Sequence, residues 1–167
     1  MKTRKLTNTA VLAAFSLAIF VLESHIPPLV PLYGVKLGLA NVVTLYAKAT
    51  LGTRCALAVL VIKIFLGNFF AGSVVSLIYS LFGGTLCFVM EMLMFRIVEK
   101  RQIWGVSITG AIFHNIGQII AATILMGTEK ILWYLTLLVP VGILTGAFTG
   151  ICAMYTLKAT EKIHNRR

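Results

Sequence analysis

The stretch YGVKLGLANVVTLY, residues 33–46, places two strongly polar side chains in an otherwise apolar segment. It predicts a helix over residues 35–51, with Lys36 at its mouth and Asn41 about one and a half turns inside. Pro28 and Pro31 precede the stretch. Because proline fixes φ and lacks a backbone N–H, the chain is expected to enter this helix through a stiff, non-helical elbow. Polar groups at the start of a membrane helix are costly unless they have a function. We therefore expect the rest of the chain to form a bundle that keeps the start of this helix in position.

Composition indicates an integral membrane protein. Hydrophobic residues make up 59% of the 167 residues and charged residues only 12%, whereas soluble domains are about 25% charged. Apolar runs long enough to cross a bilayer recur with no soluble domain between them, so we expect one integral membrane domain over residues 1–167. The formal net charge of +10 fits the positive-inside rule better than a nucleic-acid-binding surface, because the basic residues cluster between the apolar runs.

Six apolar segments predict an all-α membrane protein, a bundle of six transmembrane helices in the lipid bilayer. The first segment follows a basic start, as in a signal peptide. It is long for one, and no small-x-small cleavage site precedes the elbow, so we interpret it as the first helix. The segments span residues 6–22, 35–51, 55–70, 74–98, 104–126 and 131–157.

The distribution of lysine and arginine predicts the orientation in the cell membrane. With a cytoplasmic N-terminus, only Lys36 and Lys130 fall on the outer side, and Lys63 lies within the bilayer. The other basic residues fall on the cytoplasmic side: Lys2, Arg4, Lys5, Lys48, Arg54, Arg96, Lys100, Arg101, Lys158, Lys162, Arg166 and Arg167. This asymmetry predicts that both termini are cytoplasmic, which requires an even number of spans.

Polar residues that the predicted topology gathers between the bilayer midplane and the outer side are candidates for ligand binding. They are Lys36, Asn41, Lys63, Asn68, His114, Asn115 and Gln118. Charged groups at this depth cost roughly 2–3 kcal/mol on insertion scales, so we expect the set to converge on one cavity open to the outside. Structural alternatives stay open: Lys63 as a snorkelling or helix-bridging lysine, His114 bonded to a backbone carbonyl, and the amides as inter-helix hydrogen bonds.

The predicted cavity contains cations and amides but no acid, which favours an anionic ligand or one rich in carbonyl or phosphate oxygens. A cation or proton pathway would need buried carboxylates. One histidine without nearby acids or thiols is too little for a metal site. Glu23 is expected at the water interface in the elbow, and Glu91 as a cytoplasmic-side partner of Arg96 or another basic residue.

Sequence motifs of catalysis are absent. The chain has no G-x-S-x-G, phosphate-binding loop or H-E-x-x-H motif, and it has no aspartate, since its five acids are all glutamates. Magnesium-dependent diphosphate chemistry needs clustered carboxylates to hold the metal. We therefore predict that the chain is not an enzyme by itself, uses no cofactor and relies on a partner for any ATP-driven step. The thiols of Cys55, Cys87 and Cys152 lie in or beside apolar segments and are interpreted as inert.

Small residues recur every four positions in two of the predicted helices. Ala10, Ala14 and Ala18 form a smooth stripe that serves either as a docking face for a partner helix or for packing within the bundle. The second set, Gly142, Gly146 and Gly150, predicts a face at which another helix approaches closely.

Four motifs resemble those of a known membrane family. They are GVKLGLAN at residues 34–41, LGNFFAGS at 66–73, YSLFGG at 79–84 and GAIFHNIGQ at 110–118. Over nearly its whole length the chain resembles the family labelled heptaprenyl diphosphate synthase component I, also called the Gx transporter family. More remotely, six helices with a small-residue stripe resemble the substrate-binding (S) components of energy-coupling factor transporters. In those proteins the stripe docks on a membrane coupling subunit that works with ATPases, and the ligand lies toward the outer face.

The resemblances imply two functions. The first is a substrate-binding and transport component that captures a small anionic or phosphate-bearing ligand from the outer side and passes it inward with an ATP-driven partner complex. The alternative is an accessory membrane subunit of polyprenyl diphosphate (quinone side-chain) synthesis, with a soluble prenyl synthase subunit as partner. The catalytic subunit of such enzymes carries aspartate-rich motifs, which this chain lacks, so its role there would be accessory.

Overall fold

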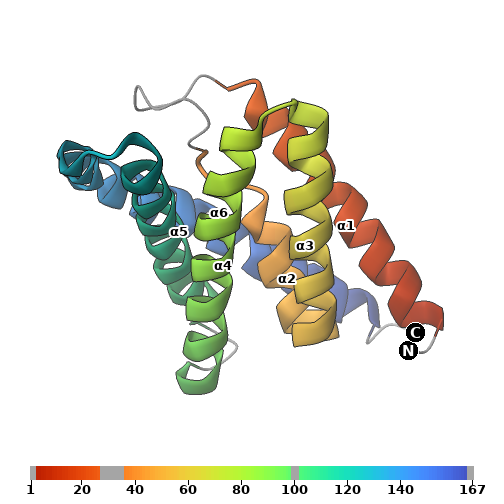
Figure 1. Cartoon of the computed structure of the whole chain (residues 1–167). Coiled ribbons are helices and arrows are strands. Elements are labelled where there is room, and N and C mark those ends of the chain that lie inside the picture. The colour runs from red at the N-terminus through yellow and green to blue at the C-terminus, as the bar shows by residue number, and fades with distance from the viewer. Residues whose placement is uncertain (1–2, 27–35, 99–101, 165–167) are drawn as a thin grey trace.

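The computed structural model describes residues 3–26, 36–98 and 102–164, and this part of the chain is helical without strands. The predicted elbow with Pro28 and Pro31 lies outside the described residues. The element order is α1 (Thr3–Ser24), α2 (Asn41–Leu51), α3 (Thr53–Ala71), α4 (Val74–Ile97), α5 (Ile103–Met126), the 3₁₀ helix η2 (Glu129–Tyr134) and α6 (Leu135–His164) (Figure 1). The prediction of an all-α protein is confirmed.

Five helical stretches are long and apolar enough to cross a membrane, which agrees with five of the six predicted spans. They are α1, α3, α4, α5 and the continuous stretch Glu129–Lys162, which joins η2 to α6. Helix α2 is different, because its 11 residues extend only about 16 Å at 1.5 Å per residue, against a hydrocarbon core of about 30 Å. The sixth full span is therefore not present as a helix in the described residues.

The predicted start of the second helix at residue 35 is wrong, because residues 36–40 are not helical. Gly38 has a φ of +80°, a left-handed conformation that favours glycine and interrupts a right-handed helix. Helix α2 begins only after this glycine, at Asn41, whose backbone N–H donates to Gly38 O at 2.9 Å. We call residues 36–40 the linking segment.

The contacts between the helices divide them into two groups of three. One group contains α1, α2 and α3, and the other has α5 between α4 and α6. The groups meet where α3 contacts α4 and where α2 contacts α6. The short helix α2 thus lies inside the bundle, and its buried residues Val43 and Ala47 join an apolar core with Val59 and Leu60 of α3. This position brings the linking segment into the middle of the protein.

Glycines allow the backbones within the second group to approach closely, and the predicted glycine face of the last helix is confirmed. A Cβ atom on Gly146 would lie 2.6 Å from Ile108 Cα, and one on Gly150 would lie 2.6 Å from Trp104 Cα. Between α4 and α5, a Cβ atom on Gly117 would lie 2.7 Å from Phe82 O. Larger residues at these positions would force the helices apart.

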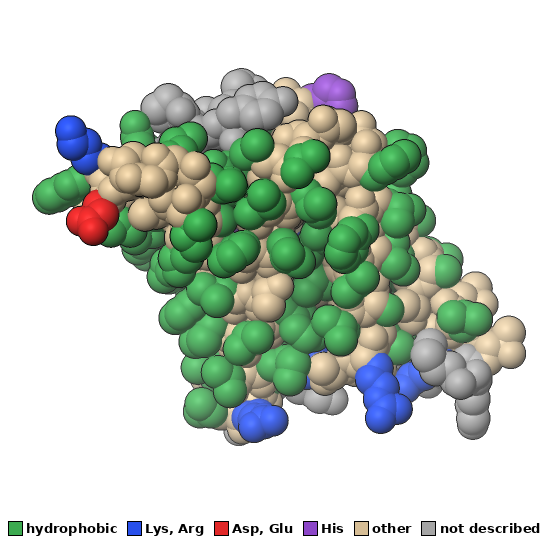
Figure 2. Space-filling model, viewed as in Figure 1, with side chains coloured by type: hydrophobic (Ala, Val, Ile, Leu, Met, Phe, Trp, Pro, Cys, Tyr) green, Lys and Arg blue, Asp and Glu red, His purple; other side chains and the backbone are tan. Residues whose placement is uncertain are grey.

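The surface of the bundle is apolar over most of its height. Phe69, Ile97 and Trp133 are among many large hydrophobic side chains that are exposed, as expected for a surface that faces lipid. Figure 2 shows hydrophobic side chains over much of the visible face, while Lys and Arg side chains lie at its lower edge and again at its upper left. The first turn of α1 and the last turn of α6 lie at the same end of the bundle in Figure 1.

Candidate functional site

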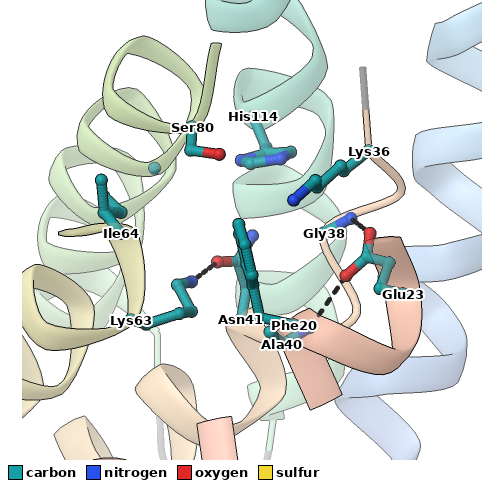
Figure 3. A pocket seen from close by; sticks show the side chains of 11 residues that line it. Phe20, Glu23, Lys36, Gly38, Ala40, Asn41, Lys63, Ile64, Ser80 and His114 are labelled. Carbon is teal, nitrogen blue, oxygen red and sulfur yellow. Dashed lines mark hydrogen bonds between the residues drawn. The ribbon is translucent and has the colours of Figure 1, made fainter. Parts of the chain in front are cut away.

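A polar cavity lies where the two groups of helices meet, and we call it the lysine cavity (Figure 3). Of the predicted ligand-binding residues, Lys36, Asn41, Lys63 and His114 line it. The remaining lining residues are Phe20, Glu23, Gly38, Ala40, Ile64, Ser80 and Gly84. The side chains leave about 10 Å³ of free space, which is room for about one water molecule. A ligand larger than water therefore requires side chains or the linking segment to move.

Two distant side chains hold the linking segment by its backbone. Glu23 Oε1 accepts the Gly38 N–H at 2.5 Å, and Glu23 Oε2 lies 3.5 Å from the Ala40 N–H. From α5, Gln118 Oε1 accepts the Lys36 N–H at 3.1 Å, and Gln118 Nε2 donates to Lys36 O at 3.0 Å. Non-helical backbone inside a membrane protein needs such partners, because its polar groups have no helical hydrogen bonds.

The expectation that Glu23 lies at the water interface, and that the cavity contains no acid, is wrong. Glu23 is only 4% exposed and lines the lysine cavity. Helix α1 continues to Ser24, which puts Glu23 on the same buried face as Ser16 and Phe20. The spacing of three and four between these residues was the sequence feature that could have identified it.

Glu91 also differs from its expected role. It is 3% exposed, and its hydrogen-bond partner is the Cys87 thiol at 3.6 Å, one helical turn earlier in α4, rather than Arg96. Its side chain packs against Gly110 of α5, where a Cβ atom would lie 2.8 Å from Glu91 Oε1. The bundle therefore contains two buried carboxylates.

The two lysines of the cavity have neutral partners. Lys63, which is 4% exposed, donates to Asn41 Oδ1 at 2.5 Å. Lys36 Nζ lies 3.4 Å from the centre of the Phe20 ring, a cation–π contact, and has no hydrogen-bond partner among the described residues.

His114 and Gln118 form a contact across one turn of α5, as their spacing predicts. Their Nε2 atoms are 2.5 Å apart, and because an amide nitrogen only donates, the imidazole nitrogen accepts. His114 is therefore neutral in this arrangement, with its proton on Nδ1. It contributes to the cavity as a polar group without charge.

Two of the predicted site residues lie away from the lysine cavity. Asn68 donates from Nδ2 to Ile64 O of its own helix at 2.7 Å. Asn115 donates from Nδ2 to Leu138 O at 2.7 Å and so joins α5 to α6. The remaining one, Gln118, acts on the cavity through the backbone of Lys36 and through His114.

Comparison with known proteins gives one family. The family model described as heptaprenyl diphosphate synthase component I matches residues 12–156. Searches of curated proteins and of solved structures found no match to the chain. The matched range includes every residue of the lysine cavity.

Proposed function

Because this chain belongs to the heptaprenyl diphosphate synthase component I family, we propose that it is a non-catalytic membrane component of polyprenyl diphosphate synthesis. In this role the lysine cavity binds the anionic diphosphate group of a substrate or product. The observation that carries the proposal is Lys36, a cation inside the bundle whose ammonium has no hydrogen-bond partner among the described residues. Lys63 of α3 reaches the same cavity (Figure 3).

The proposed role is accessory because the sequence lacks the groups that hold magnesium. It contains no aspartate and only five glutamates. Within the described residues, no group of three or more His, Cys, Asp or Glu side chains is placed to hold a metal ion. A partner subunit with its own carboxylates must therefore supply the metal chemistry of chain elongation.

Diphosphate binding requires the cavity to open, since it holds about one water molecule in this structure. Lys63 would exchange its bond to Asn41 for a phosphate oxygen, and Lys36 would turn from the Phe20 ring to the ligand. The linking segment would move outward and release its two hydrogen bonds to Gln118. Hydrogen bonds between ammonium groups and phosphate oxygens are strong enough to offset these losses, at about 1.5–3 kcal/mol each.

The test uses full-length protein in lipid nanodiscs and calorimetric titration with inorganic diphosphate. We expect the Lys36→Ala variant to bind roughly ten- to a hundred-fold more weakly than wild type, the loss of one charge-assisted hydrogen bond. Lys130→Ala is the matched control, because Lys130 is exposed and does not line the cavity. Equal affinity in wild type and Lys36→Ala would refute the proposed role of the cavity.

A second candidate function is transport, in which the chain is an S component that captures its anionic ligand from the outer side. The observation that favours it is the alanine stripe, since Ala10, Ala14 and Ala18 are all exposed on α1. In this function the stripe docks on a membrane coupling subunit, and Ala14→Trp should abolish co-purification of that subunit while diphosphate binding is retained. Co-purification of a soluble prenyl synthase subunit instead would favour the first function.

The proposal also places the protein in the cell membrane as a single domain with both termini in the cytoplasm. This arrangement needs an even number of crossings, so the linking segment and α2 together must complete the crossing that the five spanning helices leave open. The support is the distribution of Lys36 and Lys130 against the other basic residues outside the bilayer. This orientation puts the linking segment toward the outer half of the bilayer.

A further inference from the structure

A second polar cavity adjoins the lysine cavity, and we call it the Glu91 cavity. The two cavities share Gly38 and Asn41 in their linings. The other residues that line the second one are Leu37, Cys87, Glu91, Ser107, Ala111, Thr145 and Thr149. Its free space is about 10 Å³, so it also has room for about one water molecule. Its lining contains one carboxylate and no lysine or arginine.

The groups around Glu91 come from every neighbouring helix. Lys63 of α3 and Lys48 of α2 are close enough to act on it electrostatically. Helix α4 contributes the Cys87 thiol, whose hydrogen bond to Glu91 is long, at 3.6 Å. Helices α5 and α6 contribute only hydroxyl groups, among them Ser107 and Thr149, whose oxygens are 2.9 Å apart. Lysines therefore act on Glu91 from a distance, while its immediate surroundings are neutral.

Charge balance connects the two cavities. Lys63 lines the lysine cavity together with Glu23, and its hydrogen-bond partner Asn41 also lines the Glu91 cavity, so its ammonium is placed to compensate both carboxylates. With Lys36, the buried set contains two cations and two carboxylates. An anion in the lysine cavity adds negative charge to this set and draws Lys63 toward itself. Glu91 then loses part of its compensation in a region where an unpaired charge is costly.

We propose that the Glu91 cavity is a monovalent-cation site, which takes up a proton on Glu91 or a sodium ion beside it when an anion binds in the lysine cavity. The proposal rests on the proposed function of the lysine cavity. In the proton form, one Glu91 oxygen becomes a hydroxyl, and the carboxylate charge is removed. In the sodium form, the carboxylate and the hydroxyl oxygens of Ser107, Thr145 and Thr149 provide the oxygen ligands that a hard cation prefers. One carboxylate, in a cavity with room for about one water molecule, suits a monovalent ion.

The test measures inorganic diphosphate binding by full-length protein in nanodiscs, with wild type and Glu91→Gln compared. Glutamine fills the same space and resembles the protonated side chain. In the proton arm, pH is varied between about 5.5 and 7 without sodium. In the sodium arm, sodium replaces N-methylglucamine at constant ionic strength. The titration of diphosphate itself is the same for both proteins and cancels in the comparison.

If one cation is taken up with each anion, the diphosphate affinity of wild type changes by up to about tenfold per pH unit, or per tenfold change in sodium concentration. This change is additional to any change in the affinity of Glu91→Gln under the same conditions. An excess in the proton arm identifies the proton, and one in the sodium arm identifies sodium. Glu129→Gln, a change at an exposed glutamate, should behave as wild type. If Glu91→Gln does not fold, calorimetry of wild type in two buffers of different ionisation heat counts the protons taken up directly.

Two outcomes would overturn the inference, and they are distinguishable. Diphosphate binding with the same pH and sodium dependence in wild type and Glu91→Gln, or with no cation uptake by wild type, refutes the Glu91 site and leaves the proposed function standing. Absence of diphosphate binding by wild type under every condition refutes the proposed function, and the cation site with it.

Discussion

Removal of the Glu23 carboxylate tests whether this side chain holds the linking segment in place. In Glu23→Ala, the Gly38 N–H loses an acceptor at 2.5 Å, and the Ala40 N–H loses a weaker one at 3.5 Å. A buried N–H group left without a hydrogen-bond partner costs about 1–3 kcal/mol of stability. Loss of the shorter contact, to Gly38, is expected to cost an amount near the top of this range, and loss of the longer contact less. We therefore expect Glu23→Ala to lower the free energy of unfolding by about 2–4 kcal/mol.

The assay is thermal unfolding of the purified protein in detergent, followed by the fluorescence of its two tryptophans. For a chain of this length about 2–4 °C of Tm corresponds to each kcal/mol, so the expected decrease in Tm is roughly 4–16 °C. Glu23→Gln should lose less, because its amide oxygen still accepts one N–H. The control is Glu129→Ala, which changes an exposed glutamate of η2 and should leave Tm unchanged. A Tm for Glu23→Ala equal to that of wild type would refute the anchoring role.

Two further predictions concern packing and topology. Gly146→Leu should destabilise the bundle by about 1–3 kcal/mol, because the Cβ atom of the new side chain would lie 2.6 Å from Ile108 Cα. The control Ile143→Leu, at a 42% exposed position, should leave stability unchanged. Equal Tm values for the two variants would contradict this prediction. A cysteine introduced at Thr128 should react with a membrane-impermeant reagent in intact cells, whereas a cysteine at Thr3 should not react. The reverse result would mean that the orientation in the membrane is opposite to the predicted one.

Transmembrane helices were the part of the fold that the sequence predicted well, because a span is identified by its own length and apolar composition. The predicted ranges 74–98 and 104–126 correspond to α4 and α5 within a residue at each end. The glycine face of α6 was also predictable, since residues four apart lie on one side of a helix. Each of these features depends on residues that are close together in the sequence.

The linking segment was not predictable in the same way, because its backbone hydrogen bonds come from elsewhere in the chain. Glu23 is 15 residues from Gly38, and Gln118 is 82 residues from Lys36. Residues 35–40 are mostly apolar, and such a stretch is predicted as helix when the side chains that bind its backbone are unknown. Gly38 alone is a weak indication that the helix is interrupted there. The candidate site was only partly predictable for the same reason. Four of the seven predicted residues line one cavity, but the sequence predicts its acid, Glu23, at the water interface.

The arrangement of the buried charges favours exchange of partners over rigid packing. Lys63 is bonded to an amide, Lys36 lies on an aromatic ring, and Glu23 accepts from backbone N–H groups. A direct buried ion pair would oppose such an exchange, because breaking it leaves an uncompensated charge at a cost of about 3–5 kcal/mol. Charges that rest on neutral partners avoid this penalty, since a new counterion replaces a weaker contact. The lysine cavity is therefore built so that an anion can enter without first separating an ion pair.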